Sequence, residues 1–218
     1  MPSSALRSKE ALQSQCADNA LFRAHDTTAC FGANRHAAPY SSTAIEQRLA
    51  LGLALRHPAR VSRLTLISGH PGLESDAERV ARRAADAKWC ELLLDRGLPA
   101  FVDAWQAQPL WAARTQLDPA TLDRKRSERL SHDPAGLARS LRVTGLAEMP
   151  NYRQQLAQLE LPLTLCAGAL DTKFRDLAEQ MAKTVAHAEL AIVDGAGHDL
   201  LLERPELITE VIRRGNQT

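Results

Sequence analysis

Two residues with acid–base side chains directly follow two predicted strands. Asp171 lies in the segment GALDTKF after the strand Leu161–Cys166, and His198 ends the segment DGAGH after the strand Leu190–Val193. In an open parallel sheet, the carboxyl ends of neighbouring strands bring their loops together. A carboxylate beside an imidazole orients the ring and stabilises its protonated form, which suits general acid–base and nucleophilic catalysis. The alternative is two loop residues that never meet, but the nearby glycines and the matching strand-end positions favour a pair.

The elements that must position these residues alternate between strands and helices. Helical periodicity begins at Ile45–Arg56 and is followed by a buried strand at Val61–Ile67. Between that strand and the next one lies a helical block at 73–159, placed as a lid would be. Further helices are predicted at Asp76–Asp95 (ending near Gly97), Ala100–Gln106, Pro119–Leu130, Pro134–Leu146, Tyr152–Leu159, Lys173–Val185 and Pro205–Arg213. This order predicts an α/β fold with parallel crossovers.

Composition excludes several function classes. The 218 residues carry 27 Lys and Arg against 26 Asp and Glu, a net charge of +1, without the basic excess of a nucleic-acid or anionic-membrane binder. No apolar run is long enough to span a membrane, and no export signal is recognisable. The four cysteines form no CxxC pair, so we expect reduced thiols, no metal site and a cytoplasmic protein. His70, His132 and His187 are expected in loops or at the surface.

A family resemblance covers most of the chain, from about Arg48 to about Arg213. GALDTKF followed by GAGHDLLLERPE resembles the second half of an α/β-hydrolase. Between the predicted strands, SGHPGLESDAERVARRAADAKW, FVDAWQAQPLW and RLSHDPAGLARSLRVTG resemble the helical cap of one subgroup. That subgroup is the 2-succinyl-6-hydroxy-2,4-cyclohexadiene-1-carboxylate synthase (MenH) family of menaquinone biosynthesis.

The resemblance implies a lyase that eliminates pyruvate from 2-succinyl-5-enolpyruvyl-6-hydroxy-3-cyclohexene-1-carboxylate, without a cofactor. By position, Asp171 is the triad acid and His198 the base. Arg48, Arg82 and Arg129 match the arginines that bind this small-molecule polycarboxylate substrate, and Trp105 matches the cap tryptophan. A guanidinium suits a carboxylate because its fork donates two parallel hydrogen bonds. The alternatives are solvated helix faces for the arginines and core packing for Trp105.

The sequence departs from the family where the nucleophile should stand. The family's G-x-S-x-G-G turn precedes the arginine that matches Arg48, and an ungapped reading places Ala44 at the serine. Ile45, Glu46 and Gln47 follow where the strained turn needs small residues. Ser41 or Ser42 replaces the serine only if residues are inserted.

The expected domain organisation is a poorly ordered leader at 1–43, then a partial hydrolase domain at 44–218 with its cap at about 73–159. The N-terminal half of the sheet, with its oxyanion loop, is expected to be missing, which suggests a gene-model error or a degenerate paralogue. A generic esterase and a catalytically inactive binding or interaction protein are the alternative functions. An unpaired edge at Val61–Ile67 would favour self-association.

Overall fold

The structure of the protein is a computed structural model that describes residues 44–215. The predicted leader at 1–43, including Ser41 and Ser42, lies outside the described residues.

A parallel three-stranded sheet forms the centre of the described part of the chain. Strand β1 (Leu64–Ile67) pairs with β2 (Leu163–Gly168), which pairs with β3 (Ala188–Val193). Ile67 lies opposite Cys166, and Gly168 lies opposite Val193. Because all three strands run in the same direction, their carboxyl ends lie at one edge of the sheet.

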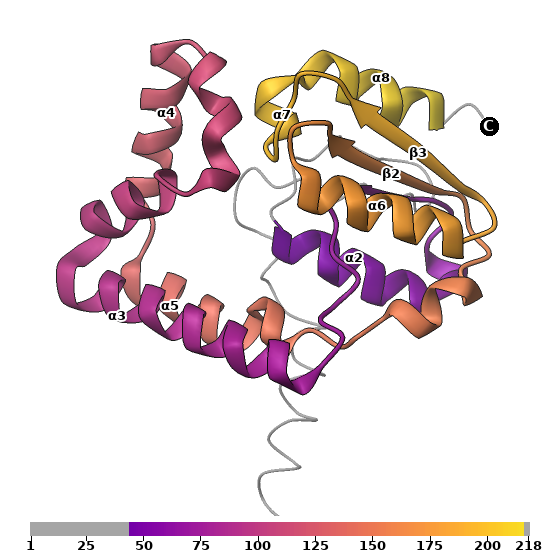
Figure 1. Cartoon of the computed structure of the whole chain (residues 1–218), viewed down its shortest axis with the longest axis horizontal. Helices are drawn as coiled ribbons and strands as arrows, with labels where there is room; N and C mark the ends of the chain where they lie inside the picture. Colours follow the sequence, from indigo (N-terminus) through magenta and orange to yellow (C-terminus); the bar gives the residue numbers. More distant parts are fainter. Residues whose placement is uncertain (1–43, 216–218) are drawn as a thin grey trace, which may run out of the picture.

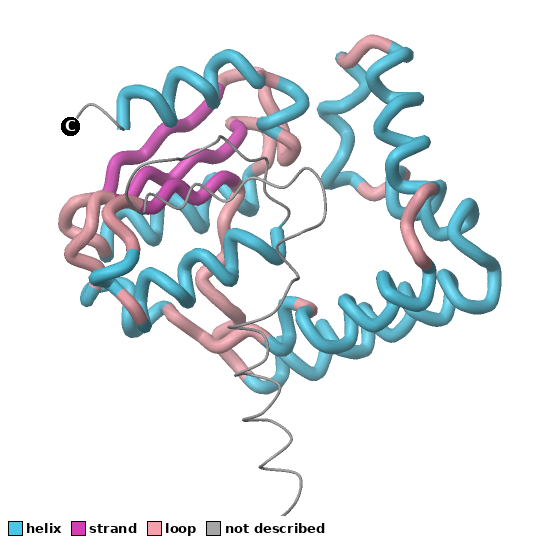
Figure 2. The backbone as a smooth tube through the Cα atoms, turned by 180° about the vertical axis from the view of Figure 1, so that it is seen from behind, coloured by secondary structure: helices cyan, strands magenta, loops and turns pink. Residues whose placement is uncertain are grey.

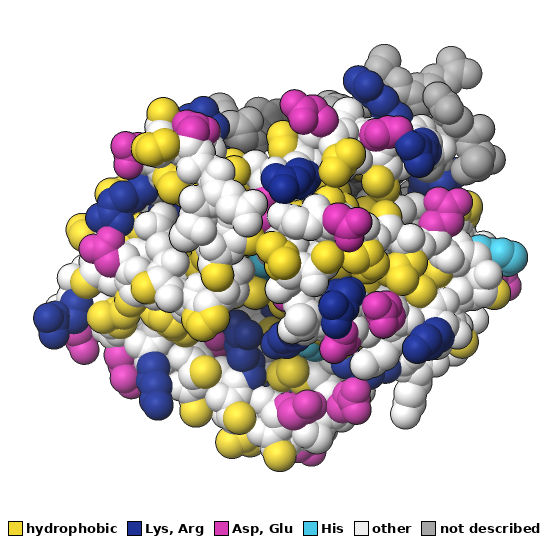
Figure 3. Space-filling view, turned by 45° about the horizontal axis from the view of Figure 1, so that its top comes forward, with side chains coloured by type: hydrophobic (Ala, Val, Ile, Leu, Met, Phe, Trp, Pro, Cys, Tyr) yellow, Lys and Arg dark blue, Asp and Glu magenta, His cyan; other side chains and the backbone are white. Residues whose placement is uncertain are grey.

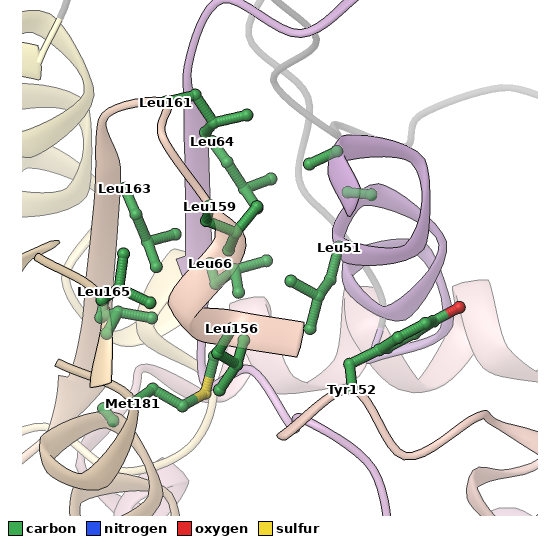
Figure 4. Close-up of a cluster of buried hydrophobic side chains, with 14 of the residues drawn as sticks. Leu51, Leu64, Leu66, Tyr152, Leu156, Leu159, Leu161, Leu163, Leu165 and Met181 are labelled. Atoms are coloured by element: carbon green, nitrogen blue, oxygen red, sulfur yellow. The ribbon is translucent and has the colours of Figure 1, made fainter. Parts of the chain in front are cut away.

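Helices cover both faces of this sheet (Figure 1). On one face pack α2 (Ala44–Arg56) and α6 (Thr172–Thr184), and on the other pack the short α7 (Leu200–Glu203) and α8 (Pro205–Gly215). Burial on both faces fits the central strand β2, in which every residue is buried. The core under α2 and α6, drawn in Figure 4, includes Leu51, Leu64, Leu66, Tyr152, Leu156, Leu163, Leu165 and Met181.

The cap is a block of helices between β1 and β2, set beside the sheet (Figures 1 and 2). It consists of α3 (Asp76–Gln106), η2 (Pro109–Gln116), α4 (Pro119–Leu130) and α5 (Pro134–Thr144), where η denotes a 3₁₀ helix. Ser75 begins α3 with a reciprocal capping box to Glu78. The cap has its own apolar cluster, made by Cys90, Leu93, Leu98, Phe101, Val102 and Ala138.

Gly97 divides α3 where the sequence predicts a helix end. Its φ of 79° and ψ of 171° are not helical, and a positive φ is readily adopted by glycine. The predicted helices on either side of it are therefore both present.

The chain returns from the cap to the sheet before β2 begins. The short helices η3 (Leu146–Glu148) and η4 (Arg153–Gln158) follow α5, and Leu146 and Leu156 are buried in the core beneath α2. A further 3₁₀ turn, η1 (Pro58–Arg60), joins α2 to β1.

The predicted order of strands and helices is confirmed, and the sequence analysis did not predict the short helices η1, η2, η3 and α7. Acidic and basic side chains are intermixed on the face seen in Figure 3. None of the helices in the described part of the chain is long and apolar enough to cross a membrane.

Candidate active site

The carboxyl ends of the strands bring three polar residues together. Ser68 follows β1, Asp171 follows β2 and His198 follows β3. The Ser68 hydroxyl donates to the backbone carbonyl of His198 at 3.1 Å. The loops after β2 and β3 are joined by a hydrogen bond of 2.9 Å from the Leu170 N–H to the Ala196 carbonyl. The site is therefore built on the end of the sheet.

Asp171 and His198, predicted as a pair, are in contact. His198 Nδ1 lies 2.6 Å from Asp171 Oδ2, and the two side chains are 12% and 5% exposed. Asp171 also caps α6, because its Oδ1 accepts the Phe174 N–H at 3.3 Å. With Nδ1 held by the carboxylate, Nε2 is the ring nitrogen that can exchange a proton with a ligand.

Backbone contacts hold the His198 loop in place. The buried Glu203 carboxylate accepts the N–H of Gly197 and, at 3.1 Å, that of Asp199, so it binds the chain on both sides of His198. Gly168 lies so close that a Cβ there would be 2.1 Å from the Gly197 carbonyl oxygen. Only glycine fits this approach of two backbones.

Two aromatic rings enclose the imidazole. Phe174, in the first turn of α6, has its ring centroid 4.5 Å from that of His198. Trp111, on η2 of the cap, lies edge-on to His198 at 5.3 Å. The cap therefore contacts His198 of the Asp171–His198 pair directly, through a ring that the sequence did not single out, although the QPLW segment contains it.

Trp105, the predicted cap tryptophan, lies one ring further from His198. Its centroid is 6.3 Å from that of Trp111. It packs against Trp89 at 5.2 Å and is stacked on Phe101 at 5.7 Å. In the structure Trp105 is thus part of the cap's apolar cluster, and its role in substrate binding stays a prediction.

Arg48 and Arg82 form one cationic group near the base of the cap. Arg82 Nε donates to the buried Asp86 carboxylate at 2.9 Å. The pKa of Arg48 is lowered to about 10, chiefly by burial and next by the nearby Arg82, while Asp86 opposes the change. Two guanidinium groups close together suit an anionic ligand such as a carboxylate.

Arg129 belongs to a second cationic group, on the other side of the site. Burial lowers its pKa, the neighbouring Arg114 lowers it too, and Asp199 and Glu128 oppose the change. Arg114 is buried, ion-pairs with Asp199 and stacks its guanidinium over the Trp111 ring at 3.9 Å. Sequence reasoning missed Arg114, because its partner is 85 positions away along the chain.

His70 lies in a loop, as expected, but is half-buried beside the site, whereas His132 and His187 are exposed. The Nδ1 of His70 accepts the Gly72 N–H at 3.0 Å, and the His70 ring meets the Phe174 ring edge-on, with centroids 6.2 Å apart. The pKa of His70 is lowered to about 4, chiefly by burial and then by four cations: Lys173, Arg153, Arg48 and Arg82. A cavity of about 290 Å³ beside His70 is lined by Arg153, Lys173 and Asp176 among others.

The nucleophile position has no hydroxyl. Ala44 is the first residue of α2, and Gln47 is buried where the family motif has its last glycine. Among the described residues, the hydroxyl bonded to His198 is that of Ser68, and it contacts the backbone carbonyl rather than the ring.

Within residues 44–215, no cluster of three or more His, Cys, Asp or Glu could hold a metal ion.

Comparison with known proteins confirms the resemblance. The chain is 34% identical over 165 residues to a putative 2-succinyl-6-hydroxy-2,4-cyclohexadiene-1-carboxylate synthase of Bacillus subtilis, covering 76% of this chain and 60% of that protein. It is 31% identical to the synthase of an Enterobacter species, covering 74% of this chain and 59% of that protein. No protein-family model matches.

Solved structures of other proteins share the fold of this chain. MenH from S. aureus superposes with a TM-score of 0.78 at 27% identity, over 81% of this chain and 66% of that one. An esterase from Thermogutta terrifontis, at 22% identity and a TM-score of 0.65, covers 78% of this chain and 61% of that one and shares the fold. The chain therefore has the α/β-hydrolase fold and spans about 60% of the length of the curated relatives that it matches.

Proposed function

We propose that this chain catalyses the elimination of pyruvate that yields 2-succinyl-6-hydroxy-2,4-cyclohexadiene-1-carboxylate, with His198 as the base. The imidazole removes the proton from the ring carbon that carries the succinyl group. The electron pair shifts through the existing double bond, and the carbon–oxygen bond to the enolpyruvyl group breaks. The departing enolate takes up a proton and becomes pyruvate, so atoms and charge balance without a redox partner.

The observation that carries this proposal is the contact between His198 and Asp171. The 2.6 Å contact at Nδ1 leaves Nε2 for proton transfer, and Asp171 stabilises the imidazolium that forms. Phe174 and Trp111 enclose the ring, so the transferred proton is shielded from bulk water. The proposed activity takes place in the cytoplasm, as expected from the sequence.

The two cationic groups suit the charges of this substrate. The product named above has a ring carboxylate and a succinyl carboxylate, and the departing group has a third. Arg48 and Arg82 act on His70, and Arg114 stacks on the Trp111 ring that contacts His198. Guanidinium groups bind carboxylates through paired, charge-assisted hydrogen bonds.

The test is pyruvate release from the enolpyruvyl substrate, followed through a coupled lactate dehydrogenase reaction. We expect His198→Ala to lower the rate by at least ~100-fold, the usual contribution of a positioned general base. His132→Ala changes an exposed histidine and serves as the matched control. Equal rates for the native chain and His198→Ala would refute the role of His198, and loss of activity in Ser41→Ala or Ser42→Ala would identify a nucleophile in the leader.

Ala44 favours a second candidate function, a carboxylate-binding protein without turnover. The hydroxyl of the family motif is replaced by a methyl group, and Ile45, Glu46 and Gln47 replace its small residues. This candidate predicts that the enolpyruvyl substrate binds, by calorimetry, while no pyruvate is released even after Ala44→Ser. Pyruvate release by the native chain refutes it.

A further inference from the structure

The 3₁₀ helix η2 carries two buried donors that have no acceptor among the described residues. These are the indole Nε1 of Trp111 and the guanidinium Nε of Arg114. The Arg114 side chain is only 9% exposed, so bulk water does not satisfy it. An unpaired buried donor costs about 1–3 kcal/mol, and more when it is charged. Two such donors on one short helix therefore indicate a ligand that accepts from both.

The two donors lie in one place, beside the catalytic ring. The Arg114 guanidinium stacks over the Trp111 indole at 3.9 Å, and the same indole meets His198 edge-on at 5.3 Å. Ala113, between them in the sequence, is close to Gly197, because a Cβ on that glycine would lie 2.6 Å from the Ala113 Cβ. The donors thus sit where the cap meets the loop that carries His198.

The local charge favours an anion. Asp199 is the acidic partner of Arg114, and Arg129 adds a second positive charge that Asp199 must share. The negative charge of Glu128 also acts on Arg129, but the Glu128 carboxylate is ion-paired with Lys125. Asp199 is therefore the acidic residue that Arg114 and Arg129 have in common, and an anion bound here would meet two cations.

We propose that the Trp111 Nε1–H and the Arg114 Nε–H form a subsite for one carboxylate group against the His198 ring. Indole and guanidinium nitrogens only donate, so the ligand group must be an acceptor, and a carboxylate has two oxygens for the two donors. The assignment of this group to a substrate or product carboxylate rests on the proposed function. Pyruvate, as the smallest carboxylate of that reaction, is the probe.

Indole NMR tests the subsite directly. The chain has three tryptophans, so ¹⁵N labelling gives three indole signals, and Trp111→Phe assigns the one concerned. We expect sodium pyruvate to move the Trp111 indole proton downfield with saturation, as a new hydrogen bond requires. The Trp89 signal, from inside the cap cluster, should stay in place, and sodium chloride at equal ionic strength should cause no saturating shift. A Trp111 signal that does not respond, or that responds equally to chloride, refutes the subsite.

Two conservative variants separate hydrogen bonding from packing. Trp111→Phe keeps an aromatic ring against His198 but loses the N–H, and Arg114→Lys keeps the charge beside Asp199 but loses Nε. Each should weaken pyruvate binding by about 10-fold or more, since hydrogen bonds to charged groups contribute about 1.5–3 kcal/mol. Trp89→Phe is the matched control and should bind as the native chain does. Equal affinity in all three variants, with unchanged melting temperatures, contradicts the proposal.

The binding measurement requires no turnover, so it separates the two proposals. A chain that binds pyruvate through Trp111 but releases none from the substrate retains the subsite and refutes the elimination. If the chain eliminates pyruvate while the Trp111 indole signal does not move, the subsite alone is refuted.

Discussion

The stability of the fold should depend on pH through His70. In the folded chain its pKa is lowered to about 4 from the ordinary 6.5, chiefly by burial and then by Lys173 and Arg153. As the pH falls, the unfolded chain therefore takes up this proton before the folded chain does. The stabilising contribution is complete above pH 6.5, and it is lost as the pH falls towards 4.

The size of the loss follows from the two pKa values. Relative to neutral pH, linkage gives a loss of about 2 kcal/mol at pH 5 and about 3 kcal/mol at pH 4, with little further change below. His70→Asn removes the titration, and its amide oxygen can still accept the Gly72 N–H. The native chain should thus lose about 3 kcal/mol more than this variant between pH 7 and pH 4.

Urea unfolding followed by circular dichroism, at one-unit steps from pH 7 to pH 4, measures this difference. His57→Asn replaces an exposed histidine and controls for the loss of a histidine as such. If the native and His70→Asn chains keep a constant difference in unfolding free energy across this range, the inference that a neutral His70 is buried among cations is wrong.

Three substitutions and one measurement of self-association probe the site and the sheet. Asp171→Asn should lower pyruvate release by ~10³-fold or more, as in other His–carboxylate pairs, while the melting temperature stays close to native because Asn also caps helices. Glu203→Ala leaves the N–H groups of Gly197 and Asp199 unpaired and should lower the free energy of unfolding in urea by roughly 2–4 kcal/mol. A smaller loss would mean that Glu203 does not fix the conformation of this loop. Gly168→Ala forces a Cβ to 2.1 Å from a carbonyl oxygen and should cost roughly 3 kcal/mol, which an unchanged urea midpoint would disprove. The predicted self-association through β1 should appear in light scattering as a mass that rises with concentration, and a monomer throughout would count against it.

The sequence predicts the catalytic pair because the signals for it are local. Asp171 and His198 each follow a short apolar run directly, and parallel pairing then places both at one edge of the sheet. The signals for the starts of the cap helices are equally local, because Ser75, Asp118 and Asp133 directly precede the helices that they cap.

Other parts of the site could not be predicted because they depend on contacts between distant segments. Trp111 and Arg114 lie on a 3₁₀ helix of eight residues, too short for a periodic pattern, and their partners are His198 and Asp199. The low pKa of His70 depends first on its burial and then on cations from several elements that lie near it. No sequence pattern encodes either arrangement, and the predicted leader at 1–43 stays a prediction.

The position of Ala44 bears differently on the two enzyme hypotheses. Ester hydrolysis through this fold requires a hydroxyl that forms a covalent acyl intermediate, so a methyl group at the nucleophile position removes the reaction itself. Elimination of pyruvate forms no such bond. It needs a base, groups that stabilise the developing negative charge, and residues that bind the carboxylates. In the proposed reaction His198 is the base and Asp171 is its acidic partner, and the groups that contain Arg48 and Arg129 would bind the carboxylates. Ala44 therefore weighs more heavily against a generic esterase than against the proposed lyase.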